Sequence, residues 1–157
     1  PEQLEVIIHP QSIIHSMVGF TDGAIMAHLG PADMRGPIGF ALNWPERVDL
    51  PLERLDFGAL GALSFQHPDP AQFPALELAT QAMQMGGLAG AVFNAAKEAA
   101  LDLFLDRRIG FLDMARVVRQ VLAQTDVSGS DTLNIKDVID ADAIARVRAG
   151  EAAQKGF

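Results

Sequence analysis

The spacing of the apolar residues changes near Pro74, and this change is the strongest constraint on the fold. Before Pro74, short β-branched runs are separated by Pro, Gly and Asp, as is typical of strands and ordered loops. After Pro74, apolar residues recur about every 3.6 positions, which is the period of an amphipathic helix. The sequence therefore predicts an α+β chain in three parts: a strand, a β-hairpin and a helix in residues 1–44, a long linker at 45–73, and an all-α helical bundle at 74–157.

Asp22-Gly23 lies between two apolar runs and predicts a β-hairpin, because both turn positions favour positive φ. A two-residue loop would pair Phe20 with Ile25 and Val18 with Ala27. This register predicts a core face formed by Ile14, Ser16, Val18, Phe20, Ile25, Ala27 and Leu29. The opposite face is mixed and holds His15, Met17, Gly19, Met26 and His28. Such a face either packs under another layer or borders a ligand pocket.

Local patterns predict the remaining elements. In the first half we expect strands at 4–8 and 60–65, and a helix at 33–43 that Asp33 caps and Trp44-Pro45 ends. In the second half we expect helices at 75–85 and 90–105, a third helix that carries residues 114–122 behind an Asp113 cap, and a last helix at about 140–153.

The charge and the cysteine count exclude several function classes. The chain of 157 residues carries 12 basic and 20 acidic side chains, and its basic residues form no stripe. Polynucleotides and anionic membranes are therefore poor partners. The absence of cysteine excludes disulfides, thiolate nucleophiles and iron–sulfur clusters, so the expected compartment is the cytoplasm. No secretion signal and no apolar run of membrane-spanning length is visible.

The histidines are the first candidate ligands. A metal site built from His9, His15, His28 and His67 requires that they converge, and the predicted register brings only His15 and His28 together. Asp33 could add a third ligand. Because no second shell is recognisable, structural or pocket-lining histidines are the preferred interpretation.

Three other patterns are explained without a catalytic or ligand-binding role. The glycine-rich stretch at 86–90 follows a helix rather than a strand, so it predicts a helix-to-helix turn and no dinucleotide site. The segment 126–137 lacks the glycine and the glutamate of a calcium loop. Asn94 could be a buried hydrogen-bonding anchor, whereas Lys97 and Glu98 are expected on a solvated face.

The string Leu4–Val18, LEVIIHPQSIIHSMV, resembles the 1-deoxy-D-xylulose 5-phosphate reductoisomerase family. Further motifs follow in that family's order and cover nearly the whole chain: Asp22-Gly23, Leu29-Gly30, Asp33-Met34-Arg35, Pro37-Ile38, Trp44-Pro45, Leu55-Asp56-Phe57, Phe73-Pro74, Asn94-Ala95-Ala96 and Ile109-Gly110-Phe111-Leu112-Asp113. The resemblance implies an oxidoreductase and isomerase of the non-mevalonate pathway of isoprenoid biosynthesis. It also implies NADPH, Mn²⁺ or Mg²⁺, and a homodimer.

The resemblance further implies that this chain is only the C-terminal portion of such an enzyme. Residues 1–44 would be the C-terminal part of the catalytic α/β domain, 45–73 the linker and 74–157 the C-terminal helical domain. The NADPH-binding domain, the metal carboxylates and the phosphate-holding groups would lie upstream of Pro1. We therefore expect no catalytic, cofactor-binding or metal residue in this chain, which alone should be inactive. His15 and Met34 would support the substrate pocket.

Three residues depart from the family pattern: Gly19, Ala32 and Lys97. Ala32 stands where proline is usual, which could loosen the loop before Met34, and Lys97 adds a charge to a helix. The alternative function is a stand-alone scaffold or interaction module descended from the enzyme, with the hairpin edge recruiting a partner strand. An upstream reading frame with the Gly-rich turn would distinguish the enzyme from the module.

Overall fold

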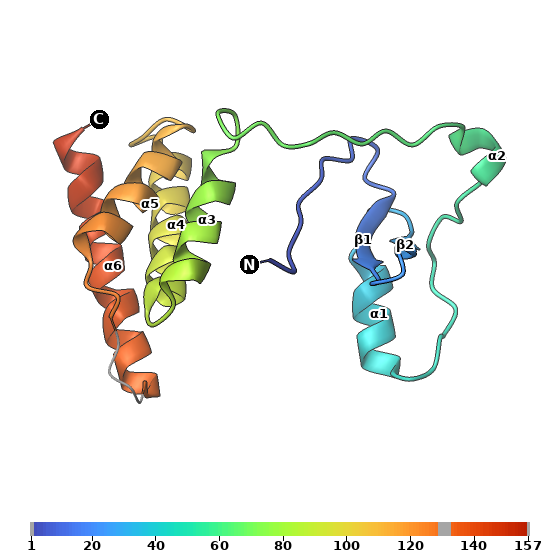
Figure 1. The fold of residues 1–157 in the computed structure, drawn as a ribbon, viewed down its shortest axis with the longest axis horizontal. Helices are drawn as coiled ribbons and strands as arrows, with labels where there is room; N and C mark the ends of the chain where they lie inside the picture. The colour runs from blue at the N-terminus through green and yellow to red at the C-terminus, as the bar shows by residue number, and fades with distance from the viewer. Residues whose placement is uncertain (1, 129–132, 157) are drawn as a thin grey trace. The chain divides into compact units, whose positions relative to one another are not determined.

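The structure is a computed structural model and describes residues 2–128 and 133–156. It divides into two compact units, one at Glu5–Pro68 and a second that joins the residues before Glu5 to those from Asp69 onward. The first unit contains β1 (Ile14–Gly19), β2 (Ile25–Leu29), α1 (Arg35–Asn43) and α2 (Phe57–Leu60), and the second contains α3 (Pro74–Met85), α4 (Ala89–Leu105), α5 (Asp113–Gln124) and α6 (Ile135–Lys155) (Figure 1). The predicted α+β class with a helical C-terminal half is confirmed.

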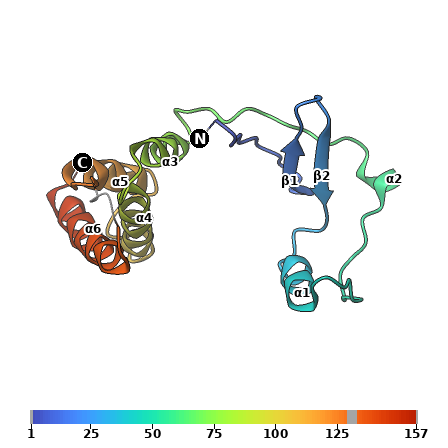
Figure 2. The same ribbon diagram turned by 60° about the horizontal axis from the view of Figure 1, so that its bottom comes forward.

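β1 and β2 form the predicted antiparallel hairpin (Figure 2), but its register differs by one residue from the expected one. Val18 pairs with Met26 rather than with Ala27. The Phe20 N–H donates to the Ala24 carbonyl at 2.9 Å, so the loop has three residues. Gly23 closes it with φ at +87°, a conformation that glycine adopts without strain.

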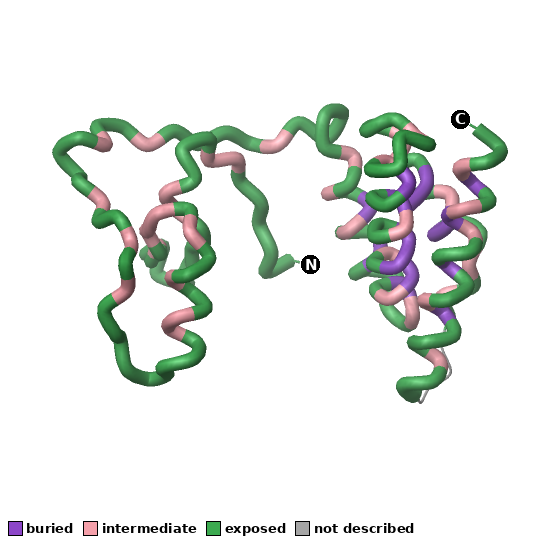
Figure 3. Tube along the Cα trace, turned by 180° about the vertical axis from the view of Figure 1, so that it is seen from behind, coloured by how far each residue is buried: buried purple, intermediate pink, exposed green. Residues whose placement is uncertain are grey.

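The expected core face of the hairpin is not buried. Val18, Phe20 and Ile25 are 56%, 50% and 70% exposed, and the described residues of β1 and β2 include no buried side chain. Figure 3 shows the buried residues within the helices of the second unit. The prediction was wrong because two strands and a nine-residue helix offer too little apolar surface to enclose a sheet face.

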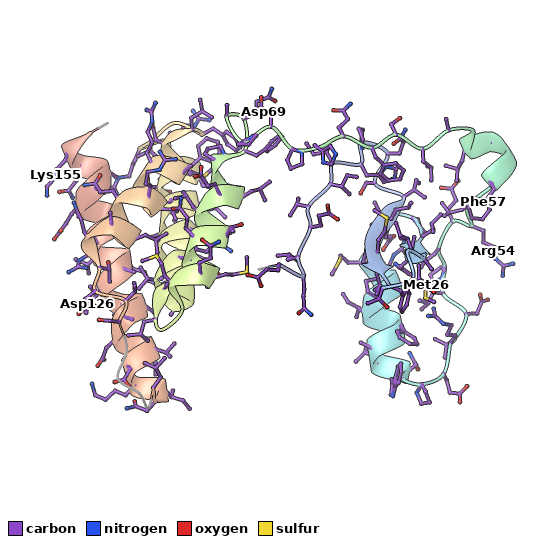
Figure 4. All side chains as sticks on the ribbon, in the orientation of Figure 1. Met26, Arg54, Phe57, Asp69, Asp126 and Lys155 are labelled. Atoms are coloured by element: carbon purple, nitrogen blue, oxygen red, sulfur yellow. The ribbon has the colours of Figure 1, made fainter. Side chains whose placement is uncertain are left out.

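The predicted strands at 4–8 and 60–65 are also not formed. Residues Phe57–Leu60 form the short helix α2 instead (Phe57 is labelled in Figure 4), and Asp56 caps it by accepting from the Gly58 and Ala59 amides. What remains of strand pairing is one antiparallel bridge between Ile8 and Gln66. Pro10 ends this pairing because its nitrogen cannot donate to a ladder.

Next to that bridge, side chains of residues 9–11 contact Ser64 and Phe65, and we call residues 9–11 the His9–Gln11 clamp. His9 Nδ1 lies 2.8 Å from the Ser64 carbonyl oxygen, and the His9 ring stacks on Phe65 with the ring centroids 4.8 Å apart. The Gln11 side chain donates to Ser64 Oγ at 3.0 Å and accepts from the Ser64 amide at 3.2 Å. His9 and Gln11, which belong to the string Leu4–Val18, therefore have a structural role.

In the second unit, α4 packs against α3, α5 and α6, and the predicted helical spacing is confirmed. α5 buries Val117, Val118, Val121 and Leu122, as its periodicity predicts. α6 buries small side chains instead: Ala141, Ala145, Ala149 and Ala152. Because a methyl group occupies little space, the small residues of α6 permit close approach of its backbone to the neighbouring helices.

Two helix starts differ from their predictions. α6 begins at Ile135 rather than near Asp140, because Asn134 and Asp137 form a reciprocal capping box. Asp113 is the first residue of α5 rather than its cap, and its carboxylate accepts from the Gly110 amide at 3.0 Å. The loop at 126–137, predicted to hold no calcium, lies partly outside the described residues.

Asn94, which the sequence allowed as a buried anchor, is exposed. Its amide donates to Glu98 at 3.2 Å, and Glu98 also accepts from Arg146 of α6 at 2.6 Å. These hydrogen bonds lower the pKa of Glu98, with Arg146 as the largest cause. Lys97 and Glu98 are exposed as predicted. Glu98 thus links α4 to α6 at the surface and takes part in no cavity that we identify among the described residues.

Candidate functional site

The candidate site is a pocket of about 640 Å³ in the unit Glu5–Pro68. The hairpin, the loop that leads to α1, α1 itself and the segment 47–52 form its walls. Its lining includes His15, His28, Met34, Phe40, Arg47 and Leu50. Most of the lining is apolar, and a few imidazole, carboxylate and guanidinium groups reach it, which is the usual composition of a small-molecule site.

His15 reaches the pocket because of an irregularity in β1. The hairpin register shifts between Ile14 and Ser16, so His15 is left without a partner residue in the ladder. Its Nε2 atom lies 3.2 Å from the Gly30 carbonyl oxygen and 3.3 Å from that of Pro31. Its ring centroid lies 5.8 Å from that of His28. His15 therefore fixes the end of β2 at the pocket wall.

Asp33 and Arg35 flank Met34 at the start of α1. The Asp33 carboxylate accepts from the Arg35 amide at 2.9 Å, from Arg35 Nε at 3.0 Å and from Nη2 at 2.6 Å. These hydrogen bonds, the side-chain ones first, lower the pKa of Asp33 to about 2. Asp33 is therefore ionised near neutral pH and accepts from one amide at the helix start. It does not cap α1 as predicted: the helix begins at Arg35, and its N-cap position is Met34, which has no side-chain cap hydrogen bond.

The far wall of the pocket is the segment 47–52, which lies against two glycines of α1. A Cβ atom on Gly39 would lie 2.7 Å from Leu50 Cδ1, whereas one on Gly36 would lie 3.5 Å from Leu52 Cδ1. The Arg47 guanidinium sits 4.3 Å from the centroid of the Phe40 ring, a cation–π distance. The absence of a side chain at Gly39 is thus what lets Leu50 approach the helix.

The two glycines give a matched test of this wall. We expect Gly36→Ala to leave stability within about 0.5 kcal/mol of the wild type, because the helix preference of alanine is offset by the clash that Pro37 imposes on a Cβ before it, while the surrounding space is open. Gly39→Ala should be less stable than Gly36→Ala because its methyl group must displace Leu50. Thermal unfolding of the two variants checks the order of stability. A Gly39→Ala variant as stable as Gly36→Ala would contradict the close approach.

The described residues include no cluster of metal ligands, and the glycine-rich stretch is a turn between two helices. Among residues 2–128 and 133–156, no three His, Asp or Glu side chains lie close enough together to hold a metal. His15 and His28 are neighbours, but the Asp33 carboxylate is engaged by Arg35. The glycines at 86–90 join α3 to α4, as predicted for a helix-to-helix turn. Among the residues that the structure describes, no helix is long and apolar enough to cross a membrane.

The structure brings His15 and Met34 to the same pocket, with His28 and Asp33 beside them. His9 and His67 are not among the residues that line it. Sequence reasoning missed Arg47, Leu50 and Leu52, which come from a segment without apolar periodicity. Their only sequence signal is their place directly after Trp44-Pro45, where the chain must turn back along α1.

The fold and the pocket define a class of two-unit α+β chains, in which a hairpin and a short helix carry the pocket and a separate helical unit follows. A family model described as the DXP reductoisomerase C-terminal domain matches residues 29–148. The chain therefore belongs to the family of DXP reductoisomerase C-terminal domains, as the sequence motifs indicated.

Individual relatives agree with this family. The chain is 54% identical over 156 residues to 1-deoxy-D-xylulose 5-phosphate reductoisomerase of Cereibacter sphaeroides, covering 98% of this chain and 40% of that protein. The enzyme of Ruegeria pomeroyi is 53% identical over 158 residues, covering 99% of this chain and 40% of that protein. The chain thus spans about 40% of the length of these curated relatives.

Solved structures give the same result. The reductoisomerase of Zymomonas mobilis in complex with NADPH matches with a TM-score of 0.87 and 44% identity, covering 98% of this chain and 40% of that chain. A DOX-P reductoisomerase in complex with NADPH, fosmidomycin and magnesium matches with a TM-score of 0.84 and 34% identity, covering 94% and 38%. The described architecture is therefore that of the C-terminal portion of these enzymes.

Proposed function

We propose that this chain is the C-terminal part of an enzyme that converts 1-deoxy-D-xylulose 5-phosphate into 2-C-methyl-D-erythritol 4-phosphate with NADPH, in non-mevalonate isoprenoid biosynthesis. The observation that carries the proposal is the 54% identity to a reductoisomerase over 98% of this chain. The pocket supports it, because His15 and Met34, the two residues assigned to the substrate pocket by family resemblance, line one cavity.

The contribution of this chain to the reaction is one wall of the substrate pocket. His15 holds the Gly30 and Pro31 carbonyls, and Met34 offers a thioether at the rim. NADPH and Mn²⁺ or Mg²⁺ would be held by the parts of the parent enzyme that the chain does not include. We therefore expect that the chain alone does not catalyse the reaction. The same proposal includes the expected domain limits: the catalytic part ends at residue 44, and the helical domain begins at residue 74.

The test compares the full-length gene product with the 157-residue chain. NADPH absorbance is followed with 1-deoxy-D-xylulose 5-phosphate and Mn²⁺. We expect turnover by the full-length protein and none by the chain alone. Metal-dependent turnover by the chain would overturn the assignment of the chemistry to the rest of the parent. No turnover by a folded full-length protein would overturn the proposed activity and favour the interaction-module alternative.

Two further properties of the parent follow from the family resemblance and belong to this proposal. We expect a homodimer, which sedimentation of the full-length protein would test. We expect the enzyme in the cytoplasm, in keeping with a chain without cysteine, and cell fractionation would test this location.

A further inference from the structure

Met34 is a pocket residue whose own side chain is poorly supported. The side chain lines the pocket and is 70% exposed, so few neighbouring atoms restrict it. A flexible thioether side chain without packing has many accessible rotamers. The direction in which Met34 enters the pocket must therefore be set by the backbone on either side of it.

Asp33 and Arg35 supply that restraint, and we call their contact the Asp33–Arg35 fork. The carboxylate oxygens face the guanidinium Nε and Nη2 at 3.0 and 2.6 Å, a two-point contact that fixes orientation as well as distance. The same carboxylate accepts from the Arg35 backbone amide. Because the two residues flank Met34 directly, the fork closes a short ring of atoms that includes the Met34 backbone.

Before the fork, the chain is anchored by His15 at the Gly30 and Pro31 carbonyls. After it, α1 begins at Arg35. The Arg35 side chain is 62% exposed, so the ion pair itself contributes little to global stability. The fork therefore acts locally, by fixing the backbone geometry at the pocket rim.

We infer that Asp33 and Arg35 are positioning residues, which act through Met34 by holding it at the rim of the substrate pocket. This inference rests on the proposed function, since it takes the pocket to receive 1-deoxy-D-xylulose 5-phosphate. It assigns no contact with the reacting atoms to either residue. Loss of the fork should therefore weaken substrate binding and leave the chemical step nearly unchanged.

The test uses steady-state kinetics of the full-length enzyme with the Asp33→Asn, Arg35→Gln and Arg35→Lys variants. We expect KM for 1-deoxy-D-xylulose 5-phosphate to rise by about threefold to tenfold in each, with kcat within about twofold, because small losses of alignment weaken contacts with a ligand. Arg35→Lys keeps the charge but loses the planar fork. A normal KM in Arg35→Lys together with a raised KM in Arg35→Gln would show that charge alone matters, and would overturn the positioning role.

Arg116→Gln is the matched control. Arg116 pairs with Asp113 at 2.8 Å on the surface of α5, and it is exposed to a similar degree as Arg35. Its KM and kcat should equal those of the wild type. Unchanged KM in both Asp33→Asn and Arg35→Gln would overturn the inference, as would a fall in kcat without a change in KM.

Hydrogen exchange of the full-length protein separates this inference from the proposed function. Asp33→Ala removes the acceptor and should speed exchange at the Arg35 amide, which donates to the carboxylate, while exchange in α5 stays unchanged. This readout needs no turnover. An inactive wild type would thus remove the proposed function alone, whereas unchanged Arg35 exchange in Asp33→Ala would remove the positioning role even in an active enzyme.

Discussion

Replacing Ala145 with leucine should destabilise the helical unit by about 3 kcal/mol, because extra methylenes in a close-packed core force side chains and backbone apart. Ala145 is fully buried in α6 and belongs to the core cluster that also contains Ala95, Ala96 and Ala100 of α4. These small residues leave no space for a larger side chain. The two helices would have to separate before a leucine could fit.

Thermal unfolding of the 157-residue chain, followed by its far-ultraviolet helical signal, measures this effect. Ala143→Leu is the matched control, because Ala143 lies on the exposed side of the same helix. Its stability should stay within about 0.5 kcal/mol of the wild type. Equal melting temperatures for the two leucine variants would show that α6 does not pack closely through its alanines.

Replacing Val121 with alanine should cost about 2 kcal/mol by the opposite mechanism, since it leaves a void where two methyl groups were packed. Val121 is fully buried in α5 and is among the largest fully buried side chains of the described residues. The core has few large side chains, so little neighbouring bulk can move in to fill the space. The cost should therefore be close to the full value for a buried valine.

The control for this variant is Val147→Ala, because Val147 of α6 is 63% exposed. Denaturant titration should give a midpoint near that of the wild type for Val147→Ala and a clearly lower one for Val121→Ala. A small effect at both positions would indicate that the helical core tolerates voids. In that case the close packing that we assign to the alanine contacts would also be in doubt.

The sequence predicted the helices well where one face of each helix is buried. α5 shows this best, since Val117, Val118 and Val121 recur at helical spacing and are all buried. The start of α6 escaped prediction because Ile135 and Ile139 are exposed, so they add no buried stripe. The signal that could have found it was local: the spacing of Asn134 and Asp137 permits a capping box.

The hairpin register could not be decided from Asp22-Gly23 alone. The dipeptide fits a two-residue loop, and it also fits a three-residue loop in which only Gly23 has positive φ. The one-residue difference transfers each side chain to a different partner, so Val18 shares a face with Met26 rather than with Ala27. His15 and Met34 both line the pocket, and their role toward a substrate stays a prediction. The far wall of the pocket was not predicted, because Arg47 and Leu50 lie in an aperiodic segment.

The His9–Gln11 clamp has a consequence for the order in which the first unit folds. Its contact between His9 and Ser64 joins residues 55 positions apart, whereas the hairpin closes across three loop residues. The entropy lost on closing a loop grows with its length, so the hairpin should form early and the clamp late. Contacts that form last also open most readily. Residues 62–66 should therefore detach first, while β1 and β2 stay paired.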